Sequence, residues 1–180
     1  LKARELGFDL CGICRPDAYP ELAFLDEWIE RGFAGEMAYL ARTADRRRDV
    51  RHVLPSTRAL IVTATNYNAP RPYSTAIDDS ATARISRYAW GDDYHEVLDA
   101  ILRKIEDALE GVMTWRYVDT GPLSDRSYAA QAGLGWIGKN GMLIHEVHGS
   151  YFFIGTLLTS LENDIAAATV ADRCGACTRC

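Results

Sequence analysis

The sequence predicts an α/β protein of the α+β type, in which a mixed central sheet is flanked by helices. Two observations lead to this fold class: β-branched, apolar runs recur along the chain, and amphipathic helical patterns lie between them. The 180 residues, 48% of them hydrophobic and 25% charged, suffice for one folded domain with a sizeable core. We find no internal repeat, and no linker that would divide the chain before Asn163.

The first half of the chain alternates strand and helix patterns. Residues 8–14 (FDLCGIC) are expected to form a short buried strand after a helical lead-in. Residues 21–32 repeat apolar side chains at a helical period and end at a glycine. Residues 58–67 (RALIVTATNY) have the β-branched content of a central strand. A proline-broken loop over residues 68–73 ends this strand, because proline cannot continue a hydrogen-bonded ladder.

The second half contains the clearest helix, over residues 92–109. Its apolar residues recur every four positions, acidic residues occupy its first turn, and Gly111 follows its end. Four further elements are expected after it: a brief strand over residues 116–119, a helix over 123–132, and strands over 142–145 and 151–159. Strands and helices are therefore interleaved along the whole chain.

Charge and hydropathy restrict the possible function classes. The formal net charge of -5 argues weakly against a dedicated nucleic-acid-binding surface, although a local patch can reverse a modest overall sign. No stretch supplies the ~18 uncharged, apolar residues of a membrane span, and the first ten residues lack the apolar block of a signal peptide. We therefore expect a cytoplasmic protein without membrane association, whose five cysteines are reduced thiols.

The strongest chemical signal is the spacing C-x2-C-x2-C of Cys174, Cys177 and Cys180. Thiolates at this spacing can bind three corners of an iron–sulfur cube. Zinc is an alternative, but its structural sites pair C-x2-C with a distant second pair of ligands. Plain core thiols are the other alternative. We favour a cluster, and because the sequence stops at least one ligand short, we expect it to be a fragment of a longer protein.

Cys11 and Cys14 form a second C-x-x-C pair, which could be a redox pair or could bind a cluster. They lie within an apolar strand pattern, where residues three apart face opposite sides and small buried cysteines are common. We therefore favour core packing for this pair.

Residues 133–141 are too rich in glycine for regular structure. The segment fits neither G-x-G-x-x-G nor the P-loop pattern, because Lys139 is followed by Asn140 and not by serine or threonine. Residues without side chains allow the backbone to approach something large and flat. The segment could therefore lie against a bulky ligand, or its glycines could serve only the packing of tight turns.

Asp119 lies at the carboxyl end of a predicted strand and precedes Thr-Gly-Pro, a position at which open α/β sheets place ligand sites. Burial against an apolar cofactor could keep such a carboxyl group protonated, so that it acts as a general acid. An Asx turn or a helix cap is the alternative role. His95, at the start of the long helix, could donate a proton or bind a ligand, but a lone histidine at a helix start is more often structural.

A basic segment interrupts the otherwise acidic chain. It contains six arginines against two aspartates, a local balance of +4: Arg42, Arg46, Arg47, Arg48, Arg51 and Arg58 against Asp45 and Asp49. Such a run could bind phosphates, although most charge runs are solvated helix faces. Arg126, further along, could bind an anion or could simply point into solvent.

Four motifs occur in a fixed order along the chain. They are residues 87–95 (RYAWGDDYH), 117–122 (YVDTGP), 132–140 (AGLGWIGKN) and 172–180 (DRCGACTRC). With these motifs the sequence resembles epoxyqueuosine reductase over nearly its whole length. The family continues past residue 180 with further cluster cysteines and a helical-repeat region. Departures are modest: Gly141 replaces a usual threonine, Asp125 and Tyr128 replace Glu and Trp, and Thr156 replaces an acidic residue.

The resemblance implies a cobalamin-dependent iron–sulfur reductase that removes the epoxide oxygen from epoxyqueuosine in a tRNA anticodon loop, the last step of queuosine biosynthesis. It implies cobalamin and a 4Fe-4S cluster as cofactors, and tRNA and an external low-potential electron donor as partners. Residues 1–163 would form a cobalamin-binding catalytic domain of the reductive-dehalogenase-like type. Residues 164–180 would be the truncated start of a ferredoxin-like 4Fe-4S domain. We expect the fragment to be inactive alone.

The resemblance also implies roles for individual residues. Asp119 would be the proton donor, and Cys174, Cys177 and Cys180 would bind part of the cluster. The candidate cofactor-binding residues are Arg84, His95, Gly133, Gly135, Trp136, Ile137, Gly138, Lys139 and Asn140. The candidates for holding phosphates of the tRNA or of the cofactor tail are Arg46, Arg48 and Arg126.

Two functions of other classes stay open. A related cobalamin reductase of a small molecule, such as a reductive dehalogenase, would share the cluster and the corrin-binding loop but would not need a basic surface for tRNA. A non-enzymatic iron–sulfur electron-transfer module would need the cysteines and no corrin pocket.

Overall fold

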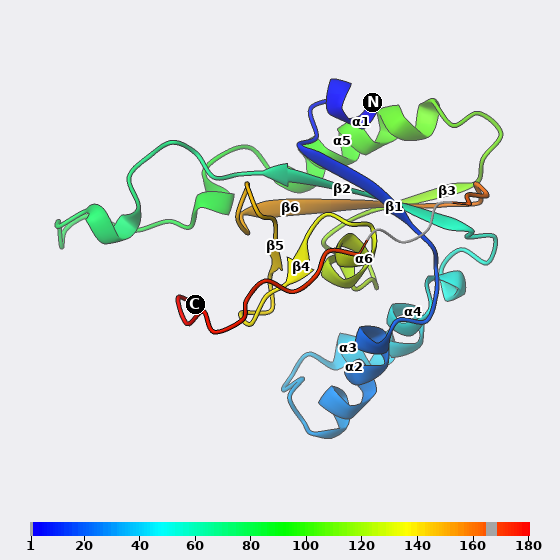
Figure 1. The fold of residues 1–180 in the computed structure, drawn as a ribbon, viewed down its shortest axis with the longest axis horizontal. Coiled ribbons are helices and arrows are strands. Elements are labelled where there is room, and N and C mark those ends of the chain that lie inside the picture. Colours follow the sequence, from blue (N-terminus) through cyan, green and yellow to red (C-terminus); the bar gives the residue numbers. More distant parts are fainter. Residues whose placement is uncertain (1, 165–168) are drawn as a thin grey trace.

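The computed structural model describes residues 2–164 and 169–180, and its centre is a four-stranded sheet (Figure 1). The strands are β1 (Leu10–Cys14), β2 (Ala59–Asn66), β3 (Thr114–Val118) and β6 (Phe152–Thr159), in the spatial order β1-β2-β6-β3. Helices cover both faces, which confirms the α/β prediction. The strands and helices predicted over residues 8–159 are all found, with most ends shifted by one or two residues.

The expectation of a mixed sheet is wrong, because every pairing between the four described strands is antiparallel. β2 and β3 run in the same direction and are joined through α5 (Tyr94–Asp107), as in a strand–helix–strand crossover. However, β6 pairs with both of them and lies between them. The interleaved pattern in the sequence shows which elements follow one another, but it does not show which strands become neighbours.

One face of the sheet is covered by α5 and α1 (Lys2–Glu5) (Figure 1). The apolar stripe of α5 buries Leu98, Leu102 and Ile105 against strand residues that include Ile61 and Leu157. The carboxylate of Asp93 caps this helix by accepting a hydrogen bond from the backbone N–H of His95. This cap fixes the start of α5 at the edge of the sheet where β2 and β3 end.

The opposite face packs against α6 (Asp125–Gln131), whose Tyr128 and Ala129 are buried among β1 and β2 residues. Gly12 of β1 allows the close approach, since a Cβ atom there would lie 2.0 Å from the carbonyl oxygen of Ala132. Cys14 is buried on this face, whereas Cys11 points to the α1 side and is exposed. Core packing is therefore confirmed for Cys14 and wrong for Cys11, because strand residues three apart face opposite sides.

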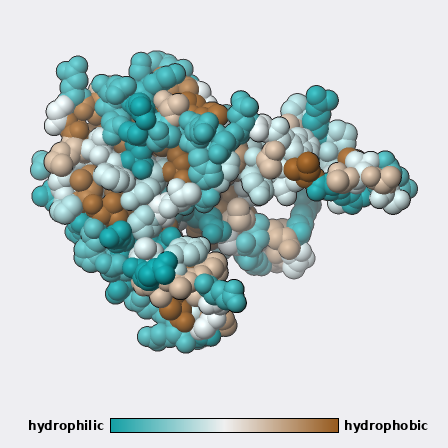
Figure 2. Space-filling view, turned by 180° about the vertical axis from the view of Figure 1, so that it is seen from behind, coloured by the Kyte–Doolittle hydropathy of each residue, from teal (hydrophilic) through white to brown (hydrophobic). Residues whose placement is uncertain are grey.

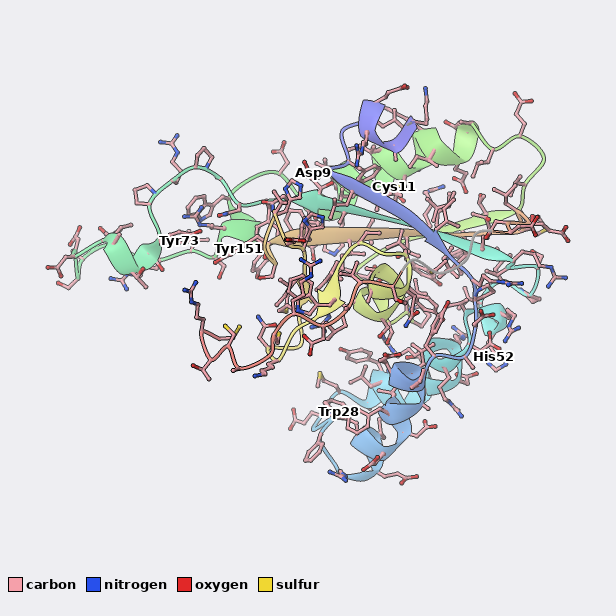
Figure 3. The ribbon with its side chains drawn as sticks, viewed as in Figure 1. Asp9, Cys11, Trp28, His52, Tyr73 and Tyr151 are labelled. Atoms are coloured by element: carbon pink, nitrogen blue, oxygen red, sulfur yellow. The ribbon has the colours of Figure 1, made fainter. Side chains whose placement is uncertain are left out.

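A helical lobe lies between β1 and β2 in the sequence and below the sheet in Figure 1. It contains α2 (Pro20–Glu30), α3 (Ala38–Arg42), α4 (Ala44–Arg48) and the 3-10 helix η1 (Val50–His52). Leu22 and Val50 attach it to the core beneath the sheet. Trp28 and His52 lie toward opposite ends of the lobe (Figure 3).

An arm formed by residues 67–93 stands apart from the body of the molecule (Figure 2). It contains the short 3-10 helices η2 (Ser74–Ala76) and η3 (Arg87–Ala89). Arg87 organises the arm: its guanidinium hydrogen-bonds the Asn68 side chain and nearby carbonyl groups, and lies over the ring of Tyr73.

Two further predictions concern the domain boundary and membrane association. The link between the proposed domains falls partly on residues 165–168, which lie outside the described residues, so the boundary at residue 163 stays a prediction. None of the helices in the described part of the chain is long and apolar enough to cross a membrane.

Candidate functional site

A cleft of about 1470 Å³ opens between the helical lobe and the sheet edge formed by the ends of β2 and β3 and the start of β6. The lobe forms one wall. The other wall consists of α6 and a small hairpin of β4 (Trp136–Ile137) and β5 (Leu143–Ile144). Small-molecule pockets usually measure ~300 to 1,000 Å³, so this cleft has room for a large ligand or for more than one.

Asp119 lines the cleft directly after the end of β3, with a φ of 58°. This left-handed conformation is uncommon for residues other than glycine. The hydroxyl group of Tyr94 donates a hydrogen bond of 2.8 Å to Oδ2 of Asp119, and His95 Nε2 lies 3.7 Å from the same oxygen. The Asp119 side chain is 65% exposed. The start of α5 therefore holds this carboxyl group at the open side of the cleft, where a bound ligand would cover it.

The two aromatic residues that contact Asp119 are themselves firmly positioned. The Tyr94 ring stacks on Phe153 at 4.2 Å and on His95 at 4.1 Å. Burial, together with the hydrogen bond to Asp119, raises the pKa of Tyr94 above its usual range, so its hydroxyl stays a donor. His95 Nδ1 lies 2.8 Å from Asp93 Oδ1, while the buried Nε2 has no hydrogen-bond partner among the described residues.

A second carboxyl group, Asp125, lines the same cleft at the first residue of α6. Burial and, after it, the negative charge of Asp119 raise the pKa of Asp125 to about 7, although the nearby Arg47 opposes this shift. The Thr156 hydroxyl donates a long hydrogen bond of 3.5 Å to Asp125 Oδ1. The raised pKa of Asp125 has no signal in the sequence, because an acid in the first turn of a helix is ordinary.

β4 lies within residues 133–141, which were expected to lack regular structure, and it pairs with β5, which lies in the strand predicted over residues 142–145. A Cβ atom on Gly135 would lie 2.1 Å from the carbonyl oxygen of Ile144, and one on Gly138 would lie 2.3 Å from the Ile144 side chain. Tight-turn packing, the alternative raised from the sequence, accounts for these two glycines. Ile137 and Gly141 line the cleft.

The other candidate cofactor-binding residues lie beside the cleft or away from it. Five belong to the hairpin or its approach but do not line the cleft: Gly133, Gly135, Trp136, Gly138 and Asn140. Arg84 lies in the arm, where its guanidinium donates a hydrogen bond of 2.8 Å to the carbonyl oxygen of Ile77. Lys139 points to the cysteine-containing end of the chain. Cofactor binding by these residues stays a prediction.

Arginines line two parts of the cleft. Arg46 and Arg47 come from the lobe, and Arg126 comes from α6, where its Nη1 donates a hydrogen bond of 2.5 Å to the carbonyl oxygen of Gly141. Arg48 does not line the cleft and instead forms an ion pair of 3.3 Å with Asp26. Of the predicted phosphate ligands, Arg46 and Arg126 are thus brought together with Asp119, and Arg48 is not.

The three clustered cysteines lie in an irregular segment beside the β4–β5 hairpin (Figure 1). The backbone N–H of Cys177 donates to the carbonyl oxygen of Cys174 at 2.8 Å, and Cys177 and Cys180 are exposed. The described residues contain no group of three His, Cys, Asp or Glu side chains arranged to hold a metal ion. The type and spacing of the thiols fit an iron–sulfur cluster, and their sulfur atoms would have to converge on binding.

Comparison with known proteins connects these features to one family. Residues 47–120 match the family model described as epoxyqueuosine reductase QueG, DUF1730. The epoxyqueuosine reductase of Gloeobacter violaceus is 43% identical over 187 residues, which cover 99% of this chain and 56% of that protein. The epoxyqueuosine reductase of Leadbetterella byssophila is 38% identical, with 99% of this chain and 59% of that protein covered. The chain thus spans less than two thirds of these relatives.

Solved structures show the same likeness. The epoxyqueuosine reductase of Streptococcus thermophilus matches with a TM-score of 0.79 and 31% identity, over 97% of this chain and 48% of that one. An epoxyqueuosine reductase crystallised with an epoxyqueuosine-modified tRNA stem loop matches with a TM-score of 0.76 and 27% identity, over 97% of this chain and 47% of that one. A catabolic reductive dehalogenase, at 17% identity and a TM-score of 0.51, shares the fold alone. In sequence and fold, the chain is a relative of the epoxyqueuosine reductases.

Proposed function

We propose that this chain is the part of an epoxyqueuosine reductase that binds cobalamin and the modified nucleoside, in an enzyme that reduces epoxyqueuosine to queuosine in tRNA. One observation carries the proposal. Asp119, in the motif that the sequence shares with this family, stands in a large cleft with its carboxylate hydrogen-bonded by Tyr94 and with His95 3.7 Å away. The similarity to epoxyqueuosine reductases supports it, and one of these was crystallised with a tRNA stem loop that carries epoxyqueuosine.

The reaction requires protons at the departing oxygen. Conversion of an epoxide to an alkene breaks both C–O bonds of the ring, consumes two electrons and two protons, and releases water. Asp119 would give the first proton to the oxygen as a C–O bond breaks, a contribution of ~10² to 10⁴-fold for a general acid. A ligand in the cleft would cover the exposed carboxyl group and exclude water from it.

Asp125 is the group in the cleft that would hold the second proton. Its carboxyl group lies deeper than that of Asp119, and its pKa of about 7 leaves it partly protonated at neutral pH. Two carboxyl groups in different environments commonly divide acid and base roles between them. Asp125 could therefore return a proton to Asp119 after the first transfer.

The cleft has the size and lining for a large, flat cofactor. Tyr67, Tyr94 and Phe153 form an aromatic cluster on one side, and Ile137 and Met142, in β4 and just before β5, line the cleft on another. These residues would lie against cobalamin, which when bound supplies a strongly reducing metal centre. The resemblance to a dehalogenase concerns the fold alone, so reduction of a small molecule is not favoured.

The proposed enzyme also needs electrons and a means of holding tRNA. Cys174, Cys177 and Cys180 would bind part of a 4Fe-4S cluster, which would pass on electrons from an external low-potential donor. Arg46 and Arg126 would bind phosphates near the cleft entrance. The relatives are longer than this chain, and the remaining cluster ligands are expected beyond residue 180.

The experiment that tests the proposal uses the anaerobically prepared full-length protein and tRNA carrying epoxyqueuosine. The wild-type protein should bind cobalamin and form queuosine, measured by mass spectrometry of digested tRNA. Asp119→Asn should lower the rate by at least ~10²-fold while cobalamin binding is retained. Near wild-type turnover in this variant would remove Asp119 from the mechanism, and the absence of corrinoid uptake by the wild-type protein would overturn the proposal as a whole.

A further inference from the structure

Lys139, in the turn between β4 and β5, binds the cysteine segment, which we define as residues 172–180. Its Nζ atom donates hydrogen bonds to the carbonyl oxygens of Gly175, at 2.6 Å, and Cys177, at 3.1 Å. An ammonium group has three donors and no acceptor, so it can serve both carbonyl groups at once. One side chain of the hairpin thus holds two alternate peptide groups of the segment.

These two contacts also set the direction of the neighbouring N–H groups. In a trans peptide the C=O and N–H bonds point to opposite sides of the chain. Since the carbonyl groups of Gly175 and Cys177 face Lys139, the N–H groups of Ala176 and Thr178 point away from it. Hydrogen bonds to the sulfur atoms are among the factors that set the reduction potential of an iron–sulfur cluster.

A second contact joins the segment to the region after β5. Arg173 Nη1 lies 2.5 Å from Glu146 Oε2, and both side chains are about half exposed. An exposed ion pair of this kind contributes little stability by itself. It nevertheless shows that the segment meets the hairpin region at two places, as its course beside β4 and β5 in Figure 1 also shows.

We propose that Lys139 is a positioning residue that seats the cysteine segment on the β4–β5 hairpin and raises the reduction potential of the cluster bound there. The cluster itself rests on the proposed function, whereas the seating does not. Reduction adds one negative charge to a cluster, and the Lys139 ammonium together with the oriented N–H groups would stabilise that charge. In this proposal Lys139 acts toward the cluster, whereas the sequence resemblance implied a role toward the corrin ring.

The first test measures the reduction potential of the anaerobically prepared full-length protein by dithionite titration with electron paramagnetic resonance. Lys139→Met is compared with Lys139→Arg and with Lys104→Met, an exposed lysine on α5 at the other face of the sheet. Lys139→Met should shift the midpoint to lower potential. Lys139→Arg and Lys104→Met should stay near the wild-type value. A wild-type midpoint in Lys139→Met would overturn the role in tuning the cluster.

The second test measures seating without the cluster. In metal-free protein, amide hydrogen exchange at Cys177, whose N–H donates to Cys174, should become about tenfold faster in Lys139→Met, the loss expected for charged hydrogen bonds. It should not change in Lys104→Met. Equal exchange in both variants would overturn the seating role. If exchange is faster in Lys139→Met but the wild-type protein takes up no cluster, the seating role is supported and the proposed cluster is refuted.

Discussion

Asp119 and Asp125 face the same cleft, and the negative charge of Asp119 helps to raise the pKa of Asp125. The two carboxyl groups are held in different ways. Asp119 is exposed and accepts a hydrogen bond from Tyr94, whereas Asp125 is half-buried beside Thr156. The pair therefore combines an exposed carboxylate with a less accessible carboxyl group that titrates near neutral pH.

Asp125→Asn should increase the stability of the protein at alkaline pH and leave it unchanged at low pH. The folded-state pKa of about 7 lies above the unfolded value of 3.8, so the native state binds more protons between these pH values. The contribution of Asp125 is therefore complete below about pH 4 and is lost as the pH rises through 7. Three pKa units correspond to at most ~4 kcal/mol, so we expect a gain of ~2 to 4 kcal/mol at pH 8.

Urea unfolding of wild type and Asp125→Asn at pH 4 and pH 8 measures this difference. Asp78→Asn, which changes an exposed aspartate in the arm, is the control and should leave the pH dependence unaltered. An Asp125→Asn variant that parallels wild type at both pH values would show that the Asp125 carboxyl group titrates normally.

Tyr94→Phe should slow turnover of the full-length enzyme about tenfold, because it removes the hydroxyl donor to Asp119 and keeps the stacked ring. Cobalamin binding should be unchanged, since the apolar surface of the cleft is preserved. Single-turnover assays on modified tRNA and a corrinoid binding titration measure the two effects. Tyr73→Phe, in the exposed arm, is the control. Equal rates in both variants would mean that the Tyr94 hydroxyl does not position Asp119.

Sequence periodicity was sufficient to predict the individual helices and strands but not the order and direction of the strands in the sheet. The four-residue spacing of apolar side chains in α5 identified the helix and most of its buried stripe, because local packing requires that spacing, although Val97 in the same spacing is exposed. The place of β6 between β2 and β3 depends on contacts between residues far apart in sequence, and no local pattern records them. The antiparallel sheet was missed for this reason.

The candidate site was predictable from the sequence where a residue belongs to a recognisable motif. Asp119 was identified by its position before Thr-Gly-Pro, and it lies in the cleft. Arg47 was named only as one arginine of the basic segment, and Asp125 only as a departure from the family pattern, because their environment arises only when α6 packs beneath the sheet and the lobe folds over it. The glycines at 135 and 138 were ambiguous in the sequence, and only the structure shows that Ile144 occupies the space beside them.

Gly135→Ala should destabilise the hairpin wall of the cleft. Its Cβ atom would lie 2.1 Å from the backbone oxygen of Ile144, which cannot move aside as a flexible side chain can. Overpacking of this kind typically costs ~1 to 3 kcal/mol. Gly91→Ala is a matched control, because a Cβ atom there meets nothing within 4 Å and the backbone has no left-handed strain. Urea unfolding should separate the two variants, and equal stability would show that β4 and β5 can move apart at no cost.

Arg116→Met should loosen the attachment of α5 to β3. Arg116 Nε donates a hydrogen bond of 2.8 Å to Asp99 Oδ1, the same guanidinium pairs with Glu106, and the Arg116 side chain is only 22% exposed. Methionine keeps much of the packing volume but leaves Glu106 without its cation and Asp99 with only the longer pair to Arg103, which we expect to cost ~1 to 3 kcal/mol. Arg103→Met is the control, because the exposed pair of Arg103 with Asp99 at 3.5 Å should contribute less than ~0.5 kcal/mol.

Thermal unfolding at low and high salt distinguishes the two arginines. The loss of stability in Arg116→Met should persist in 1 M salt, since a partly buried ion pair is screened less than an exposed one. Any loss of stability in Arg103→Met should disappear in 1 M salt. A salt-sensitive loss in Arg116→Met would show that water reaches this network freely. In that case the start of α5, and with it Tyr94 and Asp119, would be held mainly by the apolar stripe of Leu98, Leu102 and Ile105.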